Sequence, residues 1–359
     1  MADIAHNATD KIIRQTEKRL KKEYTQAAKE LEEKLNDYFR RYRLKDEKWR
    51  EWVKQGKKTQ AQYTQWKKGQ LIVGKRWRQM KDTIAEDLQH TNEIARQICL
   101  GQRADVYALN HAFGTYQIES TGGVNTSYTL YNHEAVENLI RENPKLMPPP
   151  GKQVRRDIAE GKAKRWSKQK LQSVALQSIM QGESIPHMAK RLATAVSDSN
   201  FKAAVRNART MATGAQNAGR YDAYRRAKDM GIDLTIEWAA TLDDRTRHSH
   251  RQMHGQRRNV DEPFIITDSG KTYYIMFPAD CNSSQSNAPQ QCIWNCRCTL
   301  LAWVKGFEHD TLKDSDKMTM SFEDWLKVKP GHEKYQNILH QRDVGNAIKA
   351  GHIRNYRNG

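Results

Sequence analysis

The sequence predicts an α+β protein that is mainly α: long charged N-terminal helices, a central helical region, a small antiparallel β-rich module and a short helical C-terminal tail. Three observations support this fold class. Apolar residues recur every three or four positions over residues 10–100 and 160–231, which is the period of an amphipathic helix. From residue 233 the period changes to two, as in strands with one buried face. A proline-rich stretch at 143–150 separates the two helical regions.

The composition limits the class of protein. The chain has 359 residues, enough for two or three domains, and a net charge of +19. This excess of Lys and Arg favours polyanionic partners such as nucleic acid, although a basic surface without a partner would have the same composition. The sequence has no run of about 18 apolar residues, and it begins without the apolar core of a signal peptide. We therefore expect a reducing cytoplasm, in which the five cysteines are thiols or metal ligands.

Residues 1–100 are expected to form a charged helical arm. Leu20, Leu31 and Leu35 share one helix face, with Lys, Arg and Glu between them. Several tryptophans in this arm stand among lysines and arginines. They could stack on nucleobases while the cations neutralise phosphates, or they could pack on a neighbouring helix while the lysines are solvated. Their helical spacing favours packing.

The middle of the chain changes character twice. Residues 101–150 predict a hairpin and a Pro-rich linker, because apolar and polar residues alternate around a Gly-Gly turn and prolines follow. Helices are expected again over 160–231. Gly182 is placed to end the first of them, Ser184 to cap the second, and Gly231 to end a third and longer one.

The β-rich module is expected over 233–305, and with the preceding helices it would form one domain over 151–305. Its first strand places Leu234 and Trp238 on the same face. A hairpin is predicted to turn at 268–270, and a final strand follows the last cysteines.

The remaining residues, 306–359, are expected to form a C-terminal tail. Ser321 and Asp324 resemble a capping box at the start of a short helix, with Asp in place of the usual Glu. The end of the tail is basic and rich in Gly and Asn, so we expect it to fray.

The stretch "DDRTRHSHRQMHG" and the later "NCRC" concentrate the residues that could bind a metal. Imidazole and thiolate are the ligands that Zn²⁺ prefers. Three interpretations stay open: a structural metal clip, a catalytic metal with Asp243 or Asp244 as general base, and a metal-free network of hydrogen bonds. A clip would draw its ligands from the histidines and cysteines of both segments: His248, His250, His254, Cys296 and Cys298.

Familiar catalytic motifs do not occur in this sequence. It has no G-x-x-x-x-G-K-[ST] phosphate loop and no G-x-S-x-G nucleophile elbow. Paired carboxylates do occur, as in "KELEEKL", but amid lysines they are typical of solvated ion pairs. The sequence therefore predicts a protein that is not an enzyme.

Four runs taken in order resemble a known family. They are "ARTMATGAQNAGRYDAYRRAKDMG", "IEWAATLDDRTRHSHRQMHGQ", "FPAD" and "NCRC". Together they resemble the phage head morphogenesis family, the Mu F-like minor head (minor capsid) proteins, over about residues 160–305. The positions that carry the resemblance are Arg209, Thr210, Asn217, Arg220, Trp238, Asp244, Arg245, Thr246, Arg247, His250, Gly255, Cys296, Arg297 and Cys298.

The structural clip would bind Zn²⁺ through His250, Cys296, Cys298 and His248, because in an extended segment residues two apart, such as His248 and His250, point to the same side. Some relatives carry a Cys-x-x-Cys in the first segment, where this chain has Arg247 and His250, so His250 is the expected ligand among the histidines. Arg247 replaces the first of those cysteines, and Cys281 or Cys292 could supply the missing ligand.

The resemblance also implies a structural minor head protein of a tailed bacteriophage, inside the head near the portal. Such a protein would act in head assembly, and in DNA packaging or ejection through basic contacts to DNA. Its expected partners are the portal protein, the major capsid or scaffolding protein and packaged double-stranded DNA, with no membrane before ejection. It would lie in the virion head interior, and in the host cytoplasm during assembly.

The contacts to nucleic acid or to the portal are expected from basic and aromatic residues on either side of the Pro-rich linker. They are Lys57, Lys58, Trp66, Lys67, Lys68, Arg155, Arg156, Lys164 and Arg165. The alternative is a metal-dependent nuclease or toxin-like module that uses the His/Cys cluster.

Overall fold

The computed structural model describes residues 3–123, 126, 128, 130, 162–280, 283–306 and 320–340. The chain divides into two compact units, each built from segments that are distant in sequence. The first unit takes Met1–Glu17, Ile98–Gly151 and Arg206–His352, and the second takes Lys18–Gln97, Lys152–Val205 and Ile353–Gly359. The domain boundaries predicted from the sequence follow chain order instead, and they stay a prediction.

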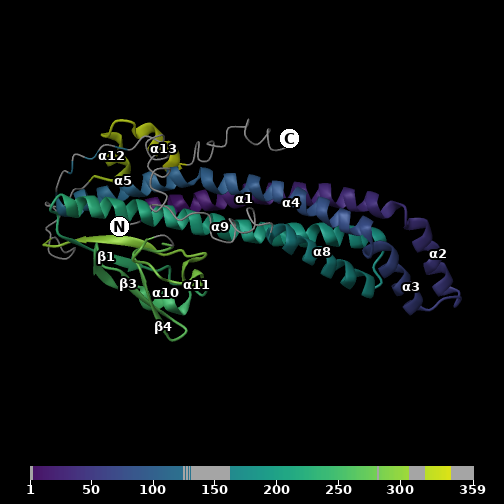
Figure 1. Cartoon of the computed structure of the whole chain (residues 1–359). Coiled ribbons are helices and arrows are strands. Elements are labelled where there is room, and N and C mark those ends of the chain that lie inside the picture. The colour runs from purple at the N-terminus through teal and green to yellow at the C-terminus, as the bar shows by residue number, and fades with distance from the viewer. Residues whose placement is uncertain are drawn as a thin grey trace. The chain divides into compact units, whose positions relative to one another are not determined.

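The second unit is helical, as the period of residues 10–100 predicted. Short turns connect its consecutive N-terminal helices, and Figure 1 shows the order of the helices along the chain. They are α1 (Ile4–Arg40, from residue 18 on), α2 (Arg43–Lys54), α3 (Gln60–Lys67), the π-helix η1 (Lys68–Ile72), α4 (Lys75–Gly101, up to residue 97), α8 (Lys162–Met180) and the first part of α9 (Ile185–Asp229).

Four tryptophans of the second unit, Trp49, Trp52, Trp66 and Trp77, pack on other aromatic rings. Trp77 is buried and stacks on Phe39, with ring centroids 6.2 Å apart. Trp49 stacks on Trp66 at 5.6 Å and meets Trp52 edge-on at 5.5 Å. Each ring therefore uses a face or an edge inside the helical unit, which is the packing that the spacing favoured.

Helix α9 is longer than the sequence predicted. We expected two helices between Ser184 and Gly231, but α9 runs without a break over 45 residues. At the expected joint the polar side chains bond to their own helix instead of capping a new one: Ser199 donates to the Ala195 carbonyl at 2.9 Å, and Asn200 donates to the Val196 carbonyl at 2.9 Å. The predicted ends are confirmed, since Gly182 and Gly231 have φ values of 68° and 87°.

The hairpin predicted after residue 100 is wrong in its first half. Residues Arg103–Gly122 form helix α5, which ends at Gly123 with a left-handed φ of 59°. Most of α5 is buried on all sides, so its sequence lacks the polar face that identifies an amphipathic helix. The second half of the predicted hairpin falls mostly, and the Pro-rich linker entirely, outside the described residues.

The first unit carries the β-strands, which lie along one side of the C-terminal half of α9 (Figure 1). The central strand β1 (Leu234–Ala239) pairs antiparallel with β2 (Arg257–Asn259) and with β5 (Thr299–Val304). The predicted hairpin is confirmed as β3 (Phe264–Asp268) and β4 (Lys271–Ile275). Two short helices complete this part: α10 (His248–Met253) and α11 (Gln290–Ile293).

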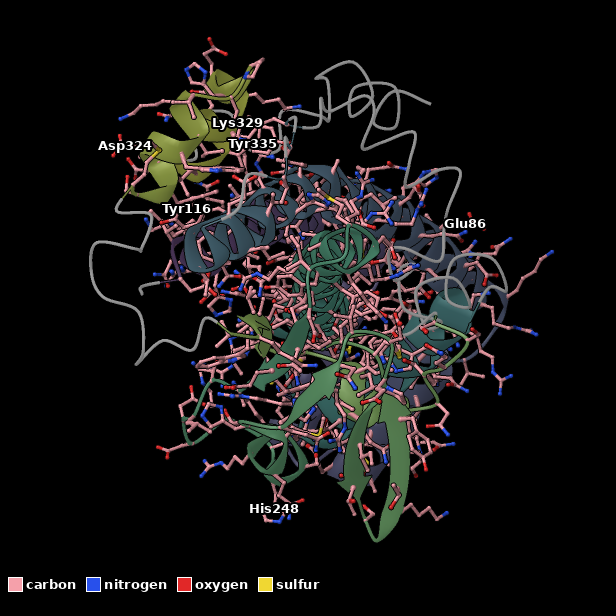
Figure 2. All side chains as sticks on the ribbon, turned by 90° about the vertical axis from the view of Figure 1, so that its left-hand side faces the viewer. Glu86, Tyr116, His248, Asp324, Lys329 and Tyr335 are labelled. Carbon is pink, nitrogen blue, oxygen red and sulfur yellow. The ribbon has the colours of Figure 1, made fainter. Side chains whose placement is uncertain are left out.

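The C-terminal helices α12 (Phe322–Lys327) and α13 (His332–His340) belong to the first unit and pack on α5. Ser321 caps α12, as predicted, by accepting the Asp324 amide at 3.2 Å. Trp325 is buried and its indole donates to Glu119 of α5 at 2.6 Å. Figure 2 shows Asp324, Lys329 and Tyr335 on this helix pair, beside Tyr116 of α5. No helix among the described residues is long and apolar enough to cross a membrane.

Candidate metal centre

Three predicted ligands come together in the first unit. His250 lies on α10, while Cys296 and Cys298 lie just before β5. The His250 Nδ1 atom is 3.3 Å from Cys298 Sγ and 3.6 Å from Cys296 Sγ. One ligand atom from each residue lies within 4.8 Å of the others, and all three residues are buried. This His/Cys/Cys group could hold a metal ion.

The distances in the group fit a tetrahedral ion. With a Zn–S bond of about 2.3 Å and a Zn–N bond of about 2.0 Å, a tetrahedral nitrogen and sulfur pair lies about 3.6 Å apart. The imidazole is also oriented for binding, because Nε2 lies 2.8 Å from the Cys292 carbonyl and can only donate there. That bond places the proton on Nε2 and leaves the Nδ1 lone pair directed at the sulfurs.

The two thiols affect each other's ionisation. Burial disfavours the Cys296 thiolate, but a hydrogen bond donated by the Cys298 thiol and the proximity of the His250 ring outweigh it and hold the pKa of Cys296 well below its usual 9.0. The hydrogen bond with Cys296, together with burial, raises the pKa of Cys298 well above 9.0. One thiolate therefore forms readily while the other sulfur keeps its proton, and a bound cation would favour loss of the second proton as well.

The structure does not bring His248 to this group. His248 is exposed at the start of α10 and points outward in Figure 2. The sequence prediction assumed an extended His-x-His, in which both rings share a side. Because the segment is helical, residues two apart point about 200° from each other around the axis. His254 is also outside the group, since its Nδ1 accepts the Ala240 amide at 3.2 Å.

An ion pair closes the loop beside the metal group. Arg297, between the two cysteines, donates both terminal nitrogens to Asp243, at 2.6 and 2.5 Å. These hydrogen bonds hold the pKa of the Asp243 carboxyl well below its usual 3.8. Asp243 is therefore committed to Arg297 and is unsuited to act as a general base. The family positions Asp244 and Arg245 are exposed, and it is Asp243 that pairs with Arg297.

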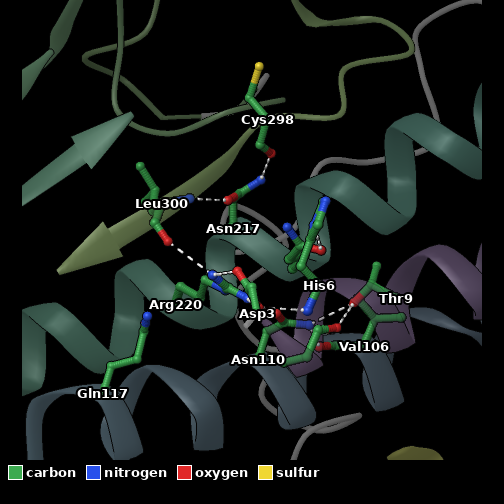
Figure 3. Close-up of polar contacts among 12 residues, drawn as sticks. Asp3, His6, Thr9, Val106, Asn110, Gln117, Asn217, Arg220, Cys298 and Leu300 are labelled. Atoms are coloured by element: carbon green, nitrogen blue, oxygen red, sulfur yellow. Dashed lines mark hydrogen bonds and ion pairs between the residues drawn. The ribbon is translucent and has the colours of Figure 1, made fainter. Parts of the chain in front are cut away.

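Two side chains of α9, Thr213 and the motif residue Asn217, bind the backbone just before β5 and at its start. Asn217 donates to the Cys298 carbonyl at 3.0 Å and accepts the Leu300 amide at 3.0 Å. Thr213 donates to the Cys296 carbonyl at 2.8 Å. Figure 3 shows Asn217 between Cys298 and Leu300. The carbonyls of both cysteines are thus bonded to side chains of α9.

Arg220 lies at the centre of a buried polar network (Figure 3). Its guanidinium donates to both carboxylate oxygens of Asp3, at 2.7 and 2.6 Å, and to the Leu300 carbonyl at 3.0 Å. Its Nε donates to Asn110 at 3.0 Å. Burial raises the pKa of Asp3, but the charge and hydrogen bonds of Arg220 outweigh it and lower that pKa below 3.8. The sequence analysis did not identify Asp3, because nothing local links it to a residue 217 positions away.

The other motif residues support the same region. A Cβ at Gly219 would lie 2.4 Å from the Tyr107 carbonyl oxygen, so α9 and α5 approach too closely there for any larger residue. The close packing at this glycine, which lies between Asn217 and Arg220, was not predicted from the sequence. Trp238 is buried and meets His250 edge-on, with ring centroids 6.0 Å apart. Gly255 ends α10 with a φ of 78°.

The remaining family positions make local or helix-to-helix contacts. Arg209 forms an ion pair with Glu17 of α1 at 2.5 Å. Thr210 accepts the Asn295 amide at 2.9 Å, just before the cysteines. Thr246 bonds to the Thr241 carbonyl, and Arg247 to the Trp294 carbonyl. These contacts hold the segments that lead into and out of the metal group.

The predicted contact residues have mixed environments. Lys57, Lys68 and Arg165 are exposed, while Lys58 and Trp66 are half-buried. The prediction for Lys67 is corrected, because that side chain is 1% exposed and its amine donates to the Glu183 carbonyl at 2.7 Å. Arg155 and Arg156 lie outside the described residues, as does the side chain of Lys164.

One family model matches the central part of the chain. Residues 169–301 match the model described as "Phage Mu protein F like protein". This range contains α9, the strands β1 to β4, the start of β5 and the His/Cys/Cys group. Through these residues the chain is similar to the phage Mu protein F like family, the family that the four runs of sequence resemble.

Two relatives show how far the similarity extends. The Minor head protein GP7 of Bacillus phage SPP1 is 26% identical over 304 residues, which are 83% of this chain and 85% of that protein. The NAD(+)–arginine ADP-ribosyltransferase EFV of Enterococcus faecalis (strain ATCC 700802 / V583) is 27% identical over 214 residues. That match covers 58% of this chain but only 40% of the transferase. No solved structure matches the chain.

Proposed function

We propose that the protein is a structural minor head protein of a tailed bacteriophage, acting in head assembly from inside the head near the portal. The observation that carries this proposal is the match with the Minor head protein GP7, which covers 83% of this chain and 85% of that protein. A shared fold does not by itself imply a shared function. A similarity that extends over most of both chains supports a shared role better than one confined to a single domain.

The partners in this proposal are the portal protein, the major capsid or scaffolding protein, and packaged double-stranded DNA. A net charge of +19 supports contact with DNA during packaging or ejection. Of the described contact candidates, Lys57, Lys68 and Arg165 are exposed and so available to phosphates. Such contacts would be independent of base sequence and would weaken as salt is raised. The protein would lie in the host cytoplasm during assembly and in the head interior afterwards, without a membrane partner before ejection.

The proposal includes a structural Zn²⁺ ion held by His250, Cys296 and Cys298. The supporting observation is the set of nitrogen to sulfur distances, 3.3 and 3.6 Å, together with the bond that fixes the imidazole tautomer. An ion at this position would join α10 to the segment before β5. Its chemical contribution would be to neutralise two buried thiolates and hold the loop.

The experiment that tests the proposed role is quantitative peptide mass spectrometry on purified, nuclease-treated phage particles. The copy number is normalised to the portal protein in the same sample. We expect a few copies in each particle. Absence from the particles, with the protein abundant in infected cells, would reject the role in the head.

An enzymatic function is the alternative. Burial argues against a metal-dependent nuclease at the His/Cys/Cys group. His250, Cys296 and Cys298 are each 2% exposed, which leaves little access for a substrate. The similarity to an NAD(+)–arginine ADP-ribosyltransferase keeps a transferase activity open to test. We expect no plasmid cleavage with Mg²⁺ or Zn²⁺, and no transfer from labelled NAD(+) to an arginine-rich acceptor. Cleavage that is lost in His250→Ala would instead support the nuclease.

A further inference from the structure

Helix α9 presents a ladder of four buried polar side chains to the segment Asn295–Leu300. The four side chains occur at intervals of three, four and three residues, and each is at most 5% exposed: Thr210, Thr213, Asn217 and Arg220. From the first to the last, the helix rises about 15 Å at about 1.5 Å per residue. The five steps from Asn295 to Leu300 span about 16 Å of extended chain at about 3.3 Å per residue. The helix and the segment therefore run side by side in step.

The ladder binds backbone atoms, and two of its members bind the cysteines themselves. Thr213 donates to the carbonyl of Cys296 at 2.8 Å, and Asn217 donates to the carbonyl of Cys298 at 3.0 Å. Asn217 also accepts the amide of Leu300, so this side chain binds the peptide groups on both sides of Thr299. A peptide group held by a hydrogen bond has a restricted orientation, and that orientation sets the direction of the adjoining Cα–Cβ bond. The two sulfurs are thereby directed at His250 on α10.

We propose that Thr213 and Asn217 are positioning residues for the metal centre, and that occupancy by a soft divalent ion such as Zn²⁺ is coupled to docking of the Asn295–Leu300 segment on α9. The inference rests on the structural ion proposed above. Without these two side chains the cysteine segment would sample more conformations, and metal binding would have to order it. With them, both sulfurs are placed before the ion arrives.

The test uses Co²⁺ as the metal, because its thiolate charge-transfer absorption reports coordination directly. The full-length, reduced protein is stripped with a chelator and titrated with Co²⁺. Thr213→Val removes the hydroxyl with little change in shape, and Thr213→Ser keeps the hydroxyl. A matched control is Thr115→Val, since Thr115 is also a buried helical threonine, but its hydroxyl donates to the His111 carbonyl of its own helix at 3.1 Å.

We expect Thr213→Val to weaken Co²⁺ binding about tenfold or more, as is usual when a residue that orients metal ligands is lost. Thr213→Ser and Thr115→Val should bind like the wild type. Circular dichroism confirms that each variant is folded before titration. An unchanged Co²⁺ Kd in Thr213→Val, even with a lower melting temperature, would overturn the positioning role and leave the metal centre in place. A wild-type protein that shows no thiolate band would reject the metal centre itself and the positioning role with it, while the copy number in particles tests the role in the head separately.

Discussion

Removal of the Asp3 carboxylate should strongly destabilise the first unit. Arg220 is fully buried, and Asp3 supplies the negative charge that its guanidinium contacts at 2.6 and 2.7 Å. Asp3→Ala would leave a buried cation with only neutral partners, the Asn110 amide and the Leu300 carbonyl. Breaking one side of a buried ion pair costs about 3–5 kcal/mol. Because the Asp3 side chain keeps 21% exposure, water can partly solvate the cation, and we expect the lower end, about 3 kcal/mol.

The assay is urea unfolding of the full-length protein, followed by far-UV circular dichroism. Glu17→Ala serves as the matched control, since Glu17 lies on helix α1, which begins just after Asp3, and pairs with Arg209, but both side chains are more exposed, at 23% and 36%. That pair should contribute less than about 1 kcal/mol. Arg220→Met in the Asp3→Ala background should recover part of the loss, because it removes the uncompensated charge. Equal and small losses for Asp3→Ala and Glu17→Ala would refute the reasoning.

Three further predictions concern packing, pH and metal removal. Gly219→Ala should lower the free energy of unfolding by about 1–3 kcal/mol or more, because the added methyl would meet the Tyr107 carbonyl. Gly69→Ala is the control, since the space around Gly69 is open. Equal losses for the two variants in a urea titration would contradict this prediction. Burial lowers the pKa of His111 below its usual 6.5 despite Asp222, so the unfolded chain takes up the proton first. The contribution of the neutral His111 to stability is then fully present above about pH 6.5, and below that pH the free energy of unfolding falls by up to about 1.4 kcal/mol per pH unit. His111→Gln should flatten the dependence of the melting temperature on pH. A chelator should lower the melting temperature of the wild type but not that of His250→Ala, and an equal effect on both would show that the chelator acts elsewhere.

Much of the fold could be predicted because the signals are local. The period of two from residue 233 identified β1, and the turn at 268–270 identified the hairpin. Helix α5 was missed because it is buried on nearly all sides and so has no polar face for a period to reveal. Helix α9 was divided in two because polar residues such as Asn200 can either cap a helix or bond within one, and the sequence alone does not distinguish these roles.

The sequence predicted that the three candidate ligands lie together, but it did not predict the side-chain contacts that hold them in place. Cys296, Cys298 and His250 are of the right residue types, and the sequence placed them correctly as a group. His248 was included because its segment was assumed to be extended, and the helical turn of α10 directs it away. The pairing of Asp3 with Arg220 depends on the tertiary fold, since the two residues are 217 positions apart and neither lies in a recognisable pattern with the other.

The most direct test of the central structural claim is the zinc content of the purified chain. Native mass spectrometry and elemental analysis would be applied to the wild type and to the double variant Cys296→Ser, Cys298→Ser, both prepared without a histidine tag. We expect one zinc ion per wild-type chain and none in the variant. A wild-type chain without metal, or a variant that keeps its ion, would contradict a metal centre at the His/Cys/Cys group.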